Sequence, residues 1–167
     1  ETGAELPTGE IGVLEVRGPN VFQGYWQMPE KTREELRENG FFITGDLAYV
    51  DERGYVTIVG RSKDLIISGG YNIYPKEIEL ILDDQAGILE SAVVGVPHPD
   101  FGETVVAILV PAQGATPDTD TIKTSVEGQL ARFKQPRSYQ IMDSLPRNTM
   151  GKVQKNILRE MFKSLFV

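Results

Sequence analysis

The sequence contains no cysteine and only one histidine, His98, among its 167 residues. The absence of cysteine excludes disulfides, cysteine metal ligands and thiol catalysis, and it suits a cytoplasmic protein. His98 stands between Pro97 and Pro99, with no second histidine for a metal site and no serine or cysteine context for a triad. We therefore interpret His98 as a loop residue and expect no metal site in this chain.

Long apolar runs and a secretory leader are also missing. Apolar residues make up 40% of the chain and charged residues 25%, which is typical of a soluble globular protein. No apolar run approaches the roughly 18 residues that a membrane span needs. The first ten residues are polar and rich in turn formers, so we expect no signal peptide and no membrane partner. Because the chain does not begin with Met, we expect it to be a piece of a longer protein.

Positive charge is scarce except at the C-terminal end. The net charge is −7, but residues 131–167 have a balance of +6, because they carry eight basic side chains and two acidic ones. The basic residues are Arg132, Lys134, Arg137, Arg147, Lys152, Lys155, Arg159 and Lys163. An anionic partner, if there is one, should meet this segment, although a solvated face on a terminal helix is the more common explanation of such a charge cluster. Few aromatic residues lie among these charges, so we do not expect a nucleic acid.

Residues 1–60 predict a β-rich region with one exposed helix. The helix is expected over Pro29–Asn39, because Pro stands at its first position and Gly40 follows as a stop signal. The strands are expected over Ile11–Arg17, Leu47–Val50 and Tyr55–Val59, the last two joined by the turn Asp51–Gly54.

The second region, after the polar stretch Gly60–Asp64, predicts a small α+β domain: a three-stranded sheet with helices, plus a short hairpin. We expect a hairpin around Ser68-Gly69-Gly70, with strands at Leu65–Ile67 and Tyr71–Tyr74. The sheet strands are expected at Ser91–Val96, Glu103–Val110 and Tyr139–Met142. The helices are expected from Pro75 to about Asp84, after Thr116 as an N-cap with Pro117 at the first position, and over Lys155–Phe166.

Lys152 is the first candidate functional residue, in the segment Pro146-Arg147-Asn148-Thr149-Met150-Gly151-Lys152. The segment lies between a predicted strand and a helix, as a phosphate-binding P-loop would. It lacks the P-loop pattern, which needs Gly at position 146 and Ser or Thr at position 153. What remains is a turn that presents a lysine beside a glycine. Such a lysine suits charge that develops on a phosphate, but a plain surface turn explains the motif better when it is taken alone.

Two further motifs have weak signals when each is taken alone. Thr44-Gly45-Asp46 offers a carboxylate that could accept hydrogen bonds from both ribose hydroxyls, although Asp after Gly is more often a turn residue. Gly69-Gly70 could let a ligand approach the backbone closely, although a simple hairpin turn explains the pair better.

The order of the motifs along the chain carries more information than any one of them. In sequence they are Gly9-Glu10-Ile11, Gly24-Tyr25-Trp26, Phe42-Ile43-Thr44-Gly45-Asp46-Leu47, Gly60-Arg61-Ser62-Lys63-Asp64-Leu65-Ile66, Gly69-Gly70-Tyr71-Asn72-Ile73-Tyr74-Pro75-Lys76-Glu77-Ile78-Glu79 and Pro146-Arg147-Asn148-Thr149-Met150-Gly151-Lys152-Val153. This series resembles the adenylate-forming enzymes: acyl-CoA synthetases, luciferases and the adenylation domains of peptide synthetases. The amino-acid sequence around the motifs is most similar to that of bacterial malonyl-CoA synthetases.

The resemblance implies a role for each candidate residue. Residues 1–62 would be the β-rich end of the large adenylation domain, and 63–167 the mobile small C-terminal domain. Asp46 would hold the ribose hydroxyls, Arg61 would contact the nucleotide, and Lys63 would be the hinge. Lys152 would reach the α-phosphate and the acyl carboxylate during adenylation. Gly69, Gly70 and Tyr71 would line the tunnel for the pantetheine arm of CoA.

The resemblance further implies an ATP-dependent carboxylic acid–CoA ligase that uses ATP, CoA and magnesium. The phosphate loop, most of the magnesium site and the acid pocket would lie upstream of Glu1, in the large domain missing from this chain, so we expect the fragment alone to be inactive. Malonate or a similar small dicarboxylate is the expected acid. Two alternatives stay open: an adenylation domain that loads a carrier protein, and a stand-alone lid-like module that binds CoA or a nucleotide.

Overall fold

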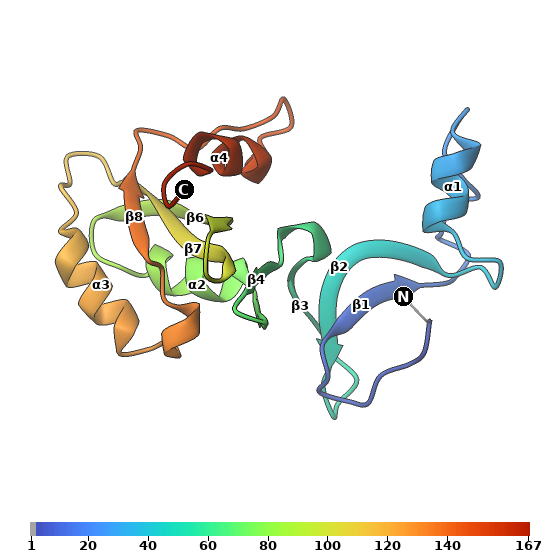
Figure 1. Cartoon of the computed structure of the whole chain (residues 1–167). Helices are drawn as coiled ribbons and strands as arrows, with labels where there is room; N and C mark the ends of the chain where they lie inside the picture. Colours follow the sequence, from blue (N-terminus) through green and yellow to red (C-terminus); the bar gives the residue numbers. More distant parts are fainter. Residues whose placement is uncertain (1–2) are drawn as a thin grey trace. The chain divides into compact units, whose positions relative to one another are not determined.

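The structure of the chain is a computed structural model that describes residues 3–167. It divides into two compact units, Glu1–Lys63 and Asp64–Val167 (Figure 1). The division falls inside a 3₁₀ turn, Ser62–Asp64, that follows the last strand of the first unit. The interpretation of these units as the end of a large domain and a mobile small domain stays a prediction.

The first unit is built on an antiparallel three-stranded sheet in the order β1-β2-β3. Its strands are β1 (Gly12–Val16), β2 (Phe42–Val50) and β3 (Val56–Arg61), and its helix is α1 (Pro29–Glu35). The turn between β2 and β3 is held by Asp51 Oδ1, which accepts from the backbone N–H of Arg53 at 2.9 Å and of Tyr55 at 2.8 Å. The predicted hairpin is therefore present, as Asx chemistry in a turn favours.

Two predicted boundaries in the first unit were wrong. The helix ends at Glu35 and not at Asn39, because Leu36 takes an extended backbone and forms a bridge with Phe42. Pairing with a neighbouring strand thus overrides the helix propensity of the charged segment. β2 begins at Phe42 and not at Leu47, so Thr44-Gly45-Asp46 lies within a strand.

The second unit contains one five-stranded sheet. Its strands are β4 (Ile66–Ser68), β5 (Tyr71–Ile73), β6 (Ile88–His98), β7 (Gly102–Pro111) and β8 (Ser138–Ile141). The strand order is β5-β4-β7-β6. The fifth strand, β8, lies off this path and pairs in parallel with β7. The α+β fold class is confirmed. The predicted hairpin joins the same sheet through one bridge, Ser68 to Gly102, and His98 lies at the end of β6 rather than in a loop.

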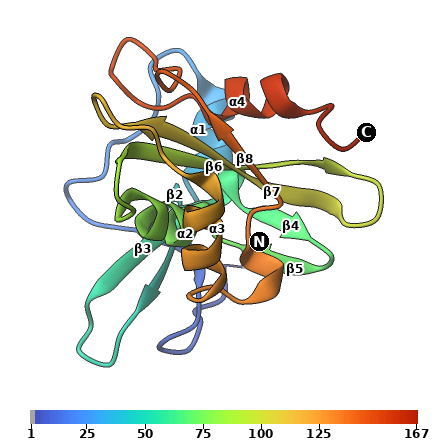
Figure 2. The same cartoon turned by 90° about the vertical axis from the view of Figure 1, so that its left-hand side faces the viewer.

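Three helices cover the two faces of this sheet: α2 (Pro75–Asp83), α3 (Thr119–Glu127) and α4 (Lys155–Phe162), with a 3₁₀ turn at Arg132–Lys134. Figure 2 shows α2 and α3 on one side of the β6–β7 ribbon and α4 on the other. Alternate residues along β6 and β7 divide the core accordingly. Val93, Val105 and Leu109 pack with α2 and α3, whereas Val94 and Ile108 pack with α4.

Two helix ends in this unit differ from the predictions. The N-cap of α3 is Asp118 and not Thr116, because the Asp118 carboxylate accepts from the N–H of Asp120 at 3.1 Å and from the hydroxyl of Thr121 at 2.7 Å. α4 ends at Phe162 instead of Phe166, although both phenylalanines still pack against the buried cluster.

Candidate functional site

Asp46 and Arg61, the two residues predicted to contact a nucleotide, face each other across β2 and β3. Arg61 Nε lies 2.9 Å from Asp46 Oδ1, and Arg61 Nη1 donates to the carbonyl of Thr44 at 3.0 Å. Asp46 is mostly covered, whereas the Arg61 side chain is half exposed. The ion pair therefore fixes a carboxylate at the surface of the sheet and still leaves it an oxygen that can accept hydrogen bonds from a ligand.

The backbone around Asp46 is unusual for the middle of a strand. Gly45 has φ +75°, a left-handed conformation that favours glycine. Thr44 Oγ1 accepts from the Asp46 N–H at 3.1 Å and donates to the carbonyl of Leu14 at 2.8 Å. These contacts determine the direction in which the Asp46 side chain leaves β2, so the Thr-Gly pair before Asp46 has a defined positional role.

Lys152 ends a tightly bonded turn that connects β8 to α4. Asn148 Oδ1 accepts from the N–H of Met150 at 3.0 Å and of Lys152 at 2.9 Å, and Arg147 Nη1 donates to the carbonyl of Gly151 at 2.6 Å. Arg147 also pairs with Glu90 of β6. The Lys152 side chain is exposed, and Nζ has no ion-pair partner within residues 3–167. A fixed backbone thus presents a cationic group to solvent, as the proposed role requires.

Gly69 and Gly70 form the two-residue turn between β4 and β5. Their φ values are +56° and +83°, and positive values at both central positions define a type I′ hairpin turn. The Gly69 N–H donates to the carbonyl of Phe101 at 2.9 Å, which joins the hairpin to the start of β7. A Cβ added at Gly70 would meet no heavy atom within 4 Å, so open space lies beside this backbone.

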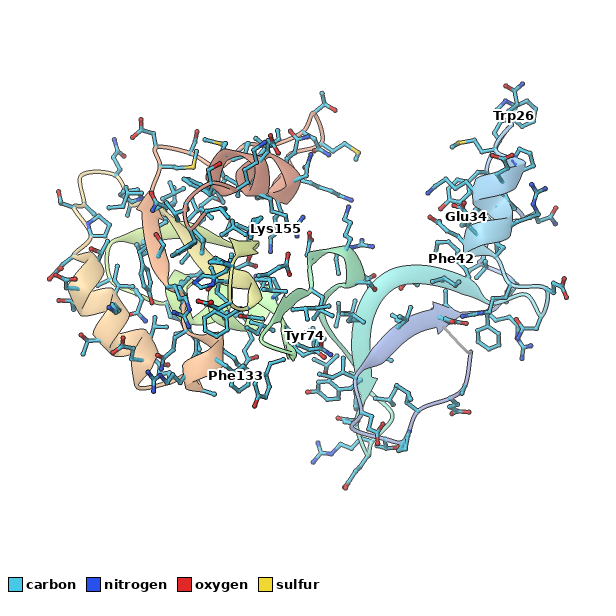
Figure 3. The ribbon with its side chains drawn as sticks, in the orientation of Figure 1. Trp26, Glu34, Phe42, Tyr74, Phe133 and Lys155 are labelled. Atoms are coloured by element: carbon cyan, nitrogen blue, oxygen red, sulfur yellow. The ribbon has the colours of Figure 1, made fainter. Side chains whose placement is uncertain are left out.

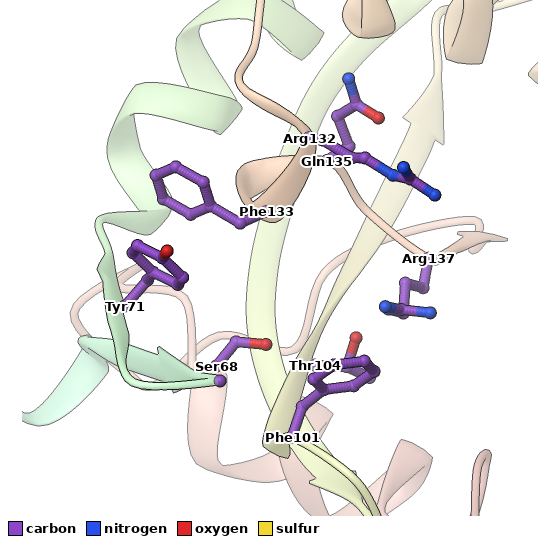
Figure 4. Close-up of a pocket in the computed structure, with 9 residues that line it drawn as sticks. Ser68, Tyr71, Phe101, Thr104, Arg132, Phe133, Gln135 and Arg137 are labelled. Carbon is purple, nitrogen blue, oxygen red and sulfur yellow. The ribbon is translucent and has the colours of Figure 1, made fainter.

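A pocket of about 150 Å³ opens beside this turn. Among the residues that line it are Gly69, Tyr71, Phe101, Arg132, Phe133 and Arg137. Figure 4 shows Tyr71 and Phe133 facing each other on one side, with Arg137 near Phe101 and Thr104 on the other. The Tyr71 and Phe133 rings stack at 4.5 Å between centroids, and the Arg137 guanidinium lies 4.4 Å from the Phe101 centroid. Flat aromatic surfaces beside guanidinium groups suit a ligand that combines a planar ring with phosphate groups.

The predicted site residues are divided between the two units. Asp46 and Arg61 lie in the first unit, and Lys63 is its last residue. Within the second unit, Gly69 and Tyr71 line the pocket, whereas Lys152 does not.

Sequence reasoning missed Phe101, Arg132, Phe133 and Arg137 as parts of the pocket. The pocket assembles from β4, β7 and the 3₁₀ turn Arg132–Lys134, which are far apart in the chain. The one available signal was the cluster of positive charge after residue 130, which had indicated where an anionic partner would bind.

Comparison with known proteins now identifies the domain. A family model described as the AMP-binding enzyme C-terminal domain matches residues 77–152. Residues 77–152 form an AMP-binding enzyme C-terminal domain. This C-terminal domain includes Lys152 and the pocket residues from Phe101 onwards, and the resemblance inferred from the motifs is confirmed.

The relatives of this AMP-binding enzyme domain include several ligases. One relative is the 3-[(3aS,4S,7aS)-7a-methyl-1,5-dioxo-octahydro-1H-inden-4-yl]propanoyl:CoA ligase of Rhodococcus jostii (strain RHA1). It is 46% identical over 95% of this chain and 31% of its own length. A fatty acid–[acyl-carrier-protein] ligase, ScoC from Streptomyces coeruleorubidus, is 44% identical over 96% of this chain and 31% of its own. The chain therefore spans about a third of the length of these relatives.

A solved structure, ATP-bound MatB from Rhodopseudomonas palustris, is 60% identical and matches all of this chain and 33% of its own, with a TM-score of 0.93. The apo crystal structure of the same protein matches with the same identity and coverage but a TM-score of 0.74. The matched part of MatB thus differs between the two crystals.

No helix within residues 3–167 is long and apolar enough to cross a membrane. In the same part of the chain, no cluster of three or more His, Asp or Glu side chains is arranged to hold a metal ion.

Proposed function

We propose that this chain is the C-terminal part of an ATP-dependent carboxylic acid–CoA ligase that acts in the cytoplasm. The full-length enzyme would first join the acid to AMP with release of pyrophosphate, and would then transfer the acyl group to the CoA thiol with release of AMP. The observation that carries the proposal is the likeness, over the whole of this chain, to ATP-bound MatB at 60% identity. The resemblance of the motifs to malonyl-CoA synthetases favours malonate or a similar small dicarboxylate as the acid.

For the first half-reaction, the chain supplies two sets of groups. The Asp46 carboxylate, held by Arg61, is suited to accept hydrogen bonds from the two ribose hydroxyls of ATP. Lys152, on its fixed turn, is suited to neutralise the negative charge that grows on the α-phosphate as the acid attacks. Magnesium would be bound mainly by the large domain upstream.

For the second half-reaction, the pocket beside Gly69 is the candidate site for CoA. The stacked pair Tyr71 and Phe133 offers a flat surface for the adenine ring, and Arg132 and Arg137 offer charge for phosphates. The open space at Gly70 leaves room for the narrow pantetheine arm to pass along the backbone.

A rotation of the small domain near Lys63 would let Lys152 and the pocket act in turn, one in each half-reaction. Lys152 and the pocket belong to the same compact unit. Each would therefore face the reacting atoms in a different orientation of that unit. The difference between the two crystals of MatB supports this idea, because the same sequence adopts two conformations there.

The ligase proposal is tested with Lys152→Ala in the full-length protein. We expect adenylate formation, measured by ATP–pyrophosphate exchange with malonate, to fall by about 10²-fold or more. Thioester formation from supplied acyl-adenylate should stay within about threefold, because Lys152 does not serve that step. Lys123→Ala, which removes another exposed lysine from the same unit, is the matched control and should change neither step. An equal fall in both half-reactions would contradict the role of Lys152.

Assays of the full-length protein would also identify the acid that it activates and the acceptor of the acyl group. Exchange assays with malonate, methylmalonate, acetate and longer acids would rank the substrates, and we expect malonate to give the highest kcat/KM.

A carrier protein as acceptor is the second candidate, favoured by the likeness to ScoC, whose name specifies an acyl-carrier protein. Comparing CoA with a phosphopantetheinylated carrier protein in the second step decides between them. Phe133→Ala should raise the KM for CoA and leave pyrophosphate exchange unchanged.

A further inference from the structure

The second unit contains a buried ion pair that the proposed function does not explain. Lys155 Nζ lies 2.5 Å from Glu79 Oε1, and both side chains are largely covered. Figure 3 shows Lys155 just below α4, on the side of that helix toward the sheet. Within residues 3–167, Glu79 and Thr104 are the two buried polar side chains. Removing two charges from water costs free energy that their mutual attraction often does not recover, so such a pair is weak evidence for stability alone.

Glu79 lies where two helices and a sheet edge meet. It belongs to α2, on one face of the sheet, and Lys155 is the first residue of α4, on the other face. Glu79 Oε1 also accepts from the N–H of Val93 at 2.9 Å. Because β6 is the outer strand, this N–H points away from β7 and has no strand partner on that side. The carboxylate thus closes the edge of β6 and links α2 to α4 around it.

The ion pair lies only three residues beyond Lys152. Leu145, before the turn, is buried, and Lys155, after it, is held by Glu79, so the segment between them is fixed at both ends. A second acidic residue, Glu90 of the edge strand β6, pairs with Arg147 inside the turn. The position of Lys152 therefore depends on two carboxylates, and Glu79 is the buried one.

We propose that Glu79 is a positioning residue for Lys152, acting through Lys155. The pair would set where α4 begins and would thereby fix the distance of Lys152 Nζ from the α-phosphate during adenylation. This inference rests on the proposed role of Lys152. Misplacement of a reacting group by 1 Å costs on the order of 10²-fold in rate, so a change outside the site can act strongly on catalysis.

The main variant is Glu79→Gln/Lys155→Met in the full-length enzyme. Gln can still accept the Val93 hydrogen bond, and removal of both charges leaves no unpaired ion, so the fold should be retained. We expect the kcat of ATP–pyrophosphate exchange to fall roughly 10- to 100-fold, with the KM for ATP within about twofold. Thioester formation from supplied acyl-adenylate should be unchanged. A general loss of structure would lower both half-reactions and the Tm together, and that outcome would overturn the proposal.

A double-mutant cycle separates this proposal from the function on which it rests. In a Lys152→Ala background, the Glu79→Gln/Lys155→Met change should cause no further loss of pyrophosphate exchange, because the residue through which it acts is already absent. Losses that multiply would show that Glu79 acts independently of Lys152 and would overturn the inference. If Lys152→Ala alone left exchange intact, the proposed function itself would fail, and this is a separate result.

Two single variants complete the design. Lys155→Arg keeps the charge and should recover exchange to within about threefold of the wild type, which a purely apolar packing role would not predict. Glu160→Gln breaks the exposed pair with Lys163, the C-cap residue of the same helix, and it should have no effect. A loss from Glu160→Gln as large as that from the double variant would mean that α4 tolerates no charge change, and the specific role of Glu79 would be rejected.

Discussion

The two units of the chain differ most in what they bury. The second unit encloses a five-stranded sheet between helices, and Val94, Ile108 and Leu158 in its core are fully covered. The first unit has a three-stranded sheet of which Leu47 and Ala48 are the buried apolar residues, and strand residues such as Val56 and Ile58 are at least half exposed. A sheet with so little covered surface is a poor candidate for independent stability. We therefore expect the second unit to be stable through its own core and the first to need contacts from outside it.

The candidate functional groups are divided in the same way. The first unit carries the Asp46–Arg61 pair on a strand, and the second carries Lys152 and the pocket on a turn and a hairpin. A self-contained second unit would be able to move as one body, as the proposed use of its two sites in alternation requires.

The largest effect is expected at the boundary between the units, with Lys63→Pro in the full-length enzyme. Proline fixes φ near −65° and restricts Ser62, so the rotation that we assign to this residue should be blocked. Adenylate formation should survive within about tenfold, equivalent to ~1.4 kcal/mol in barrier height. Thioester formation should fall by a much larger factor.

The control for this variant is Lys63→Ala. It should keep both adenylate and thioester formation, because alanine leaves the backbone at this position free to rotate. The two half-reactions are measured separately, with circular dichroism as a check on the fold. If proline lowered both steps equally while the fold stayed intact, Lys63 would not be the hinge.

The second test compares one apolar deletion in each unit. Leu158→Ala removes a fully buried side chain from the second unit and should destabilise it by about 2–5 kcal/mol. Ile58→Ala removes a side chain that is 56% exposed in the first unit and should cost less than about 0.5 kcal/mol. Urea unfolding of the chain 1–167, followed by circular dichroism, gives both values. Similar losses at the two positions would show that the first unit has a core of its own.

The smallest effect is expected for Tyr139→Phe, in the second unit. The Tyr139 hydroxyl is buried and has no hydrogen-bond partner within residues 3–167, and burial raises the pKa of this phenol to about 12. The folded state therefore favours the neutral phenol. The stability that comes from this preference for the neutral phenol is fully present below the ordinary tyrosine pKa near 10. It is lost as the pH rises toward about 12. Near neutral pH, Phe should be neutral or slightly stabilising.

Above pH 10, the Tyr139→Phe variant should lose less stability than the wild type, because it has no buried phenol to ionise. Thermal unfolding of both proteins between pH 8 and pH 11 is the measurement. Parallel loss of Tm in the two proteins would show that Tyr139 does not contribute to the alkaline transition.

Local patterns in the sequence predicted most of the second unit. Short runs rich in Val and Ile located β6 and β7, and Pro75 located the start of α2, because these signals act over a few residues. The N-cap of α3 was missed because Thr116-Pro117 and Asp118 offer competing start signals two residues apart. The end of α1 was missed because pairing of Leu36 with Phe42 depends on a neighbouring strand.

The site was predictable only in part for the same reason. Asp46, Arg61 and Lys152 belong to motifs that are short in sequence and therefore visible. The Glu79–Lys155 pair and the Tyr71–Phe133 stack each join residues far apart in the chain, and no spacing rule links them. Glu79 had one local signal, which is that it follows Ile78 directly at the border of a buried helical stripe.

The parallel pairing of β7 with β8 has a consequence for the chain as it is synthesised. β6 and β7 are joined by three residues, Pro99 to Phe101, so this hairpin can form early. β8 must wait until α3 and the segment around it have emerged, and until then the apolar edge of β7 stays open to other chains. A chain that stops before Ser138 should therefore aggregate as it leaves the ribosome, and light scattering during cell-free synthesis of chains ending at 137 and at 167 would show this difference.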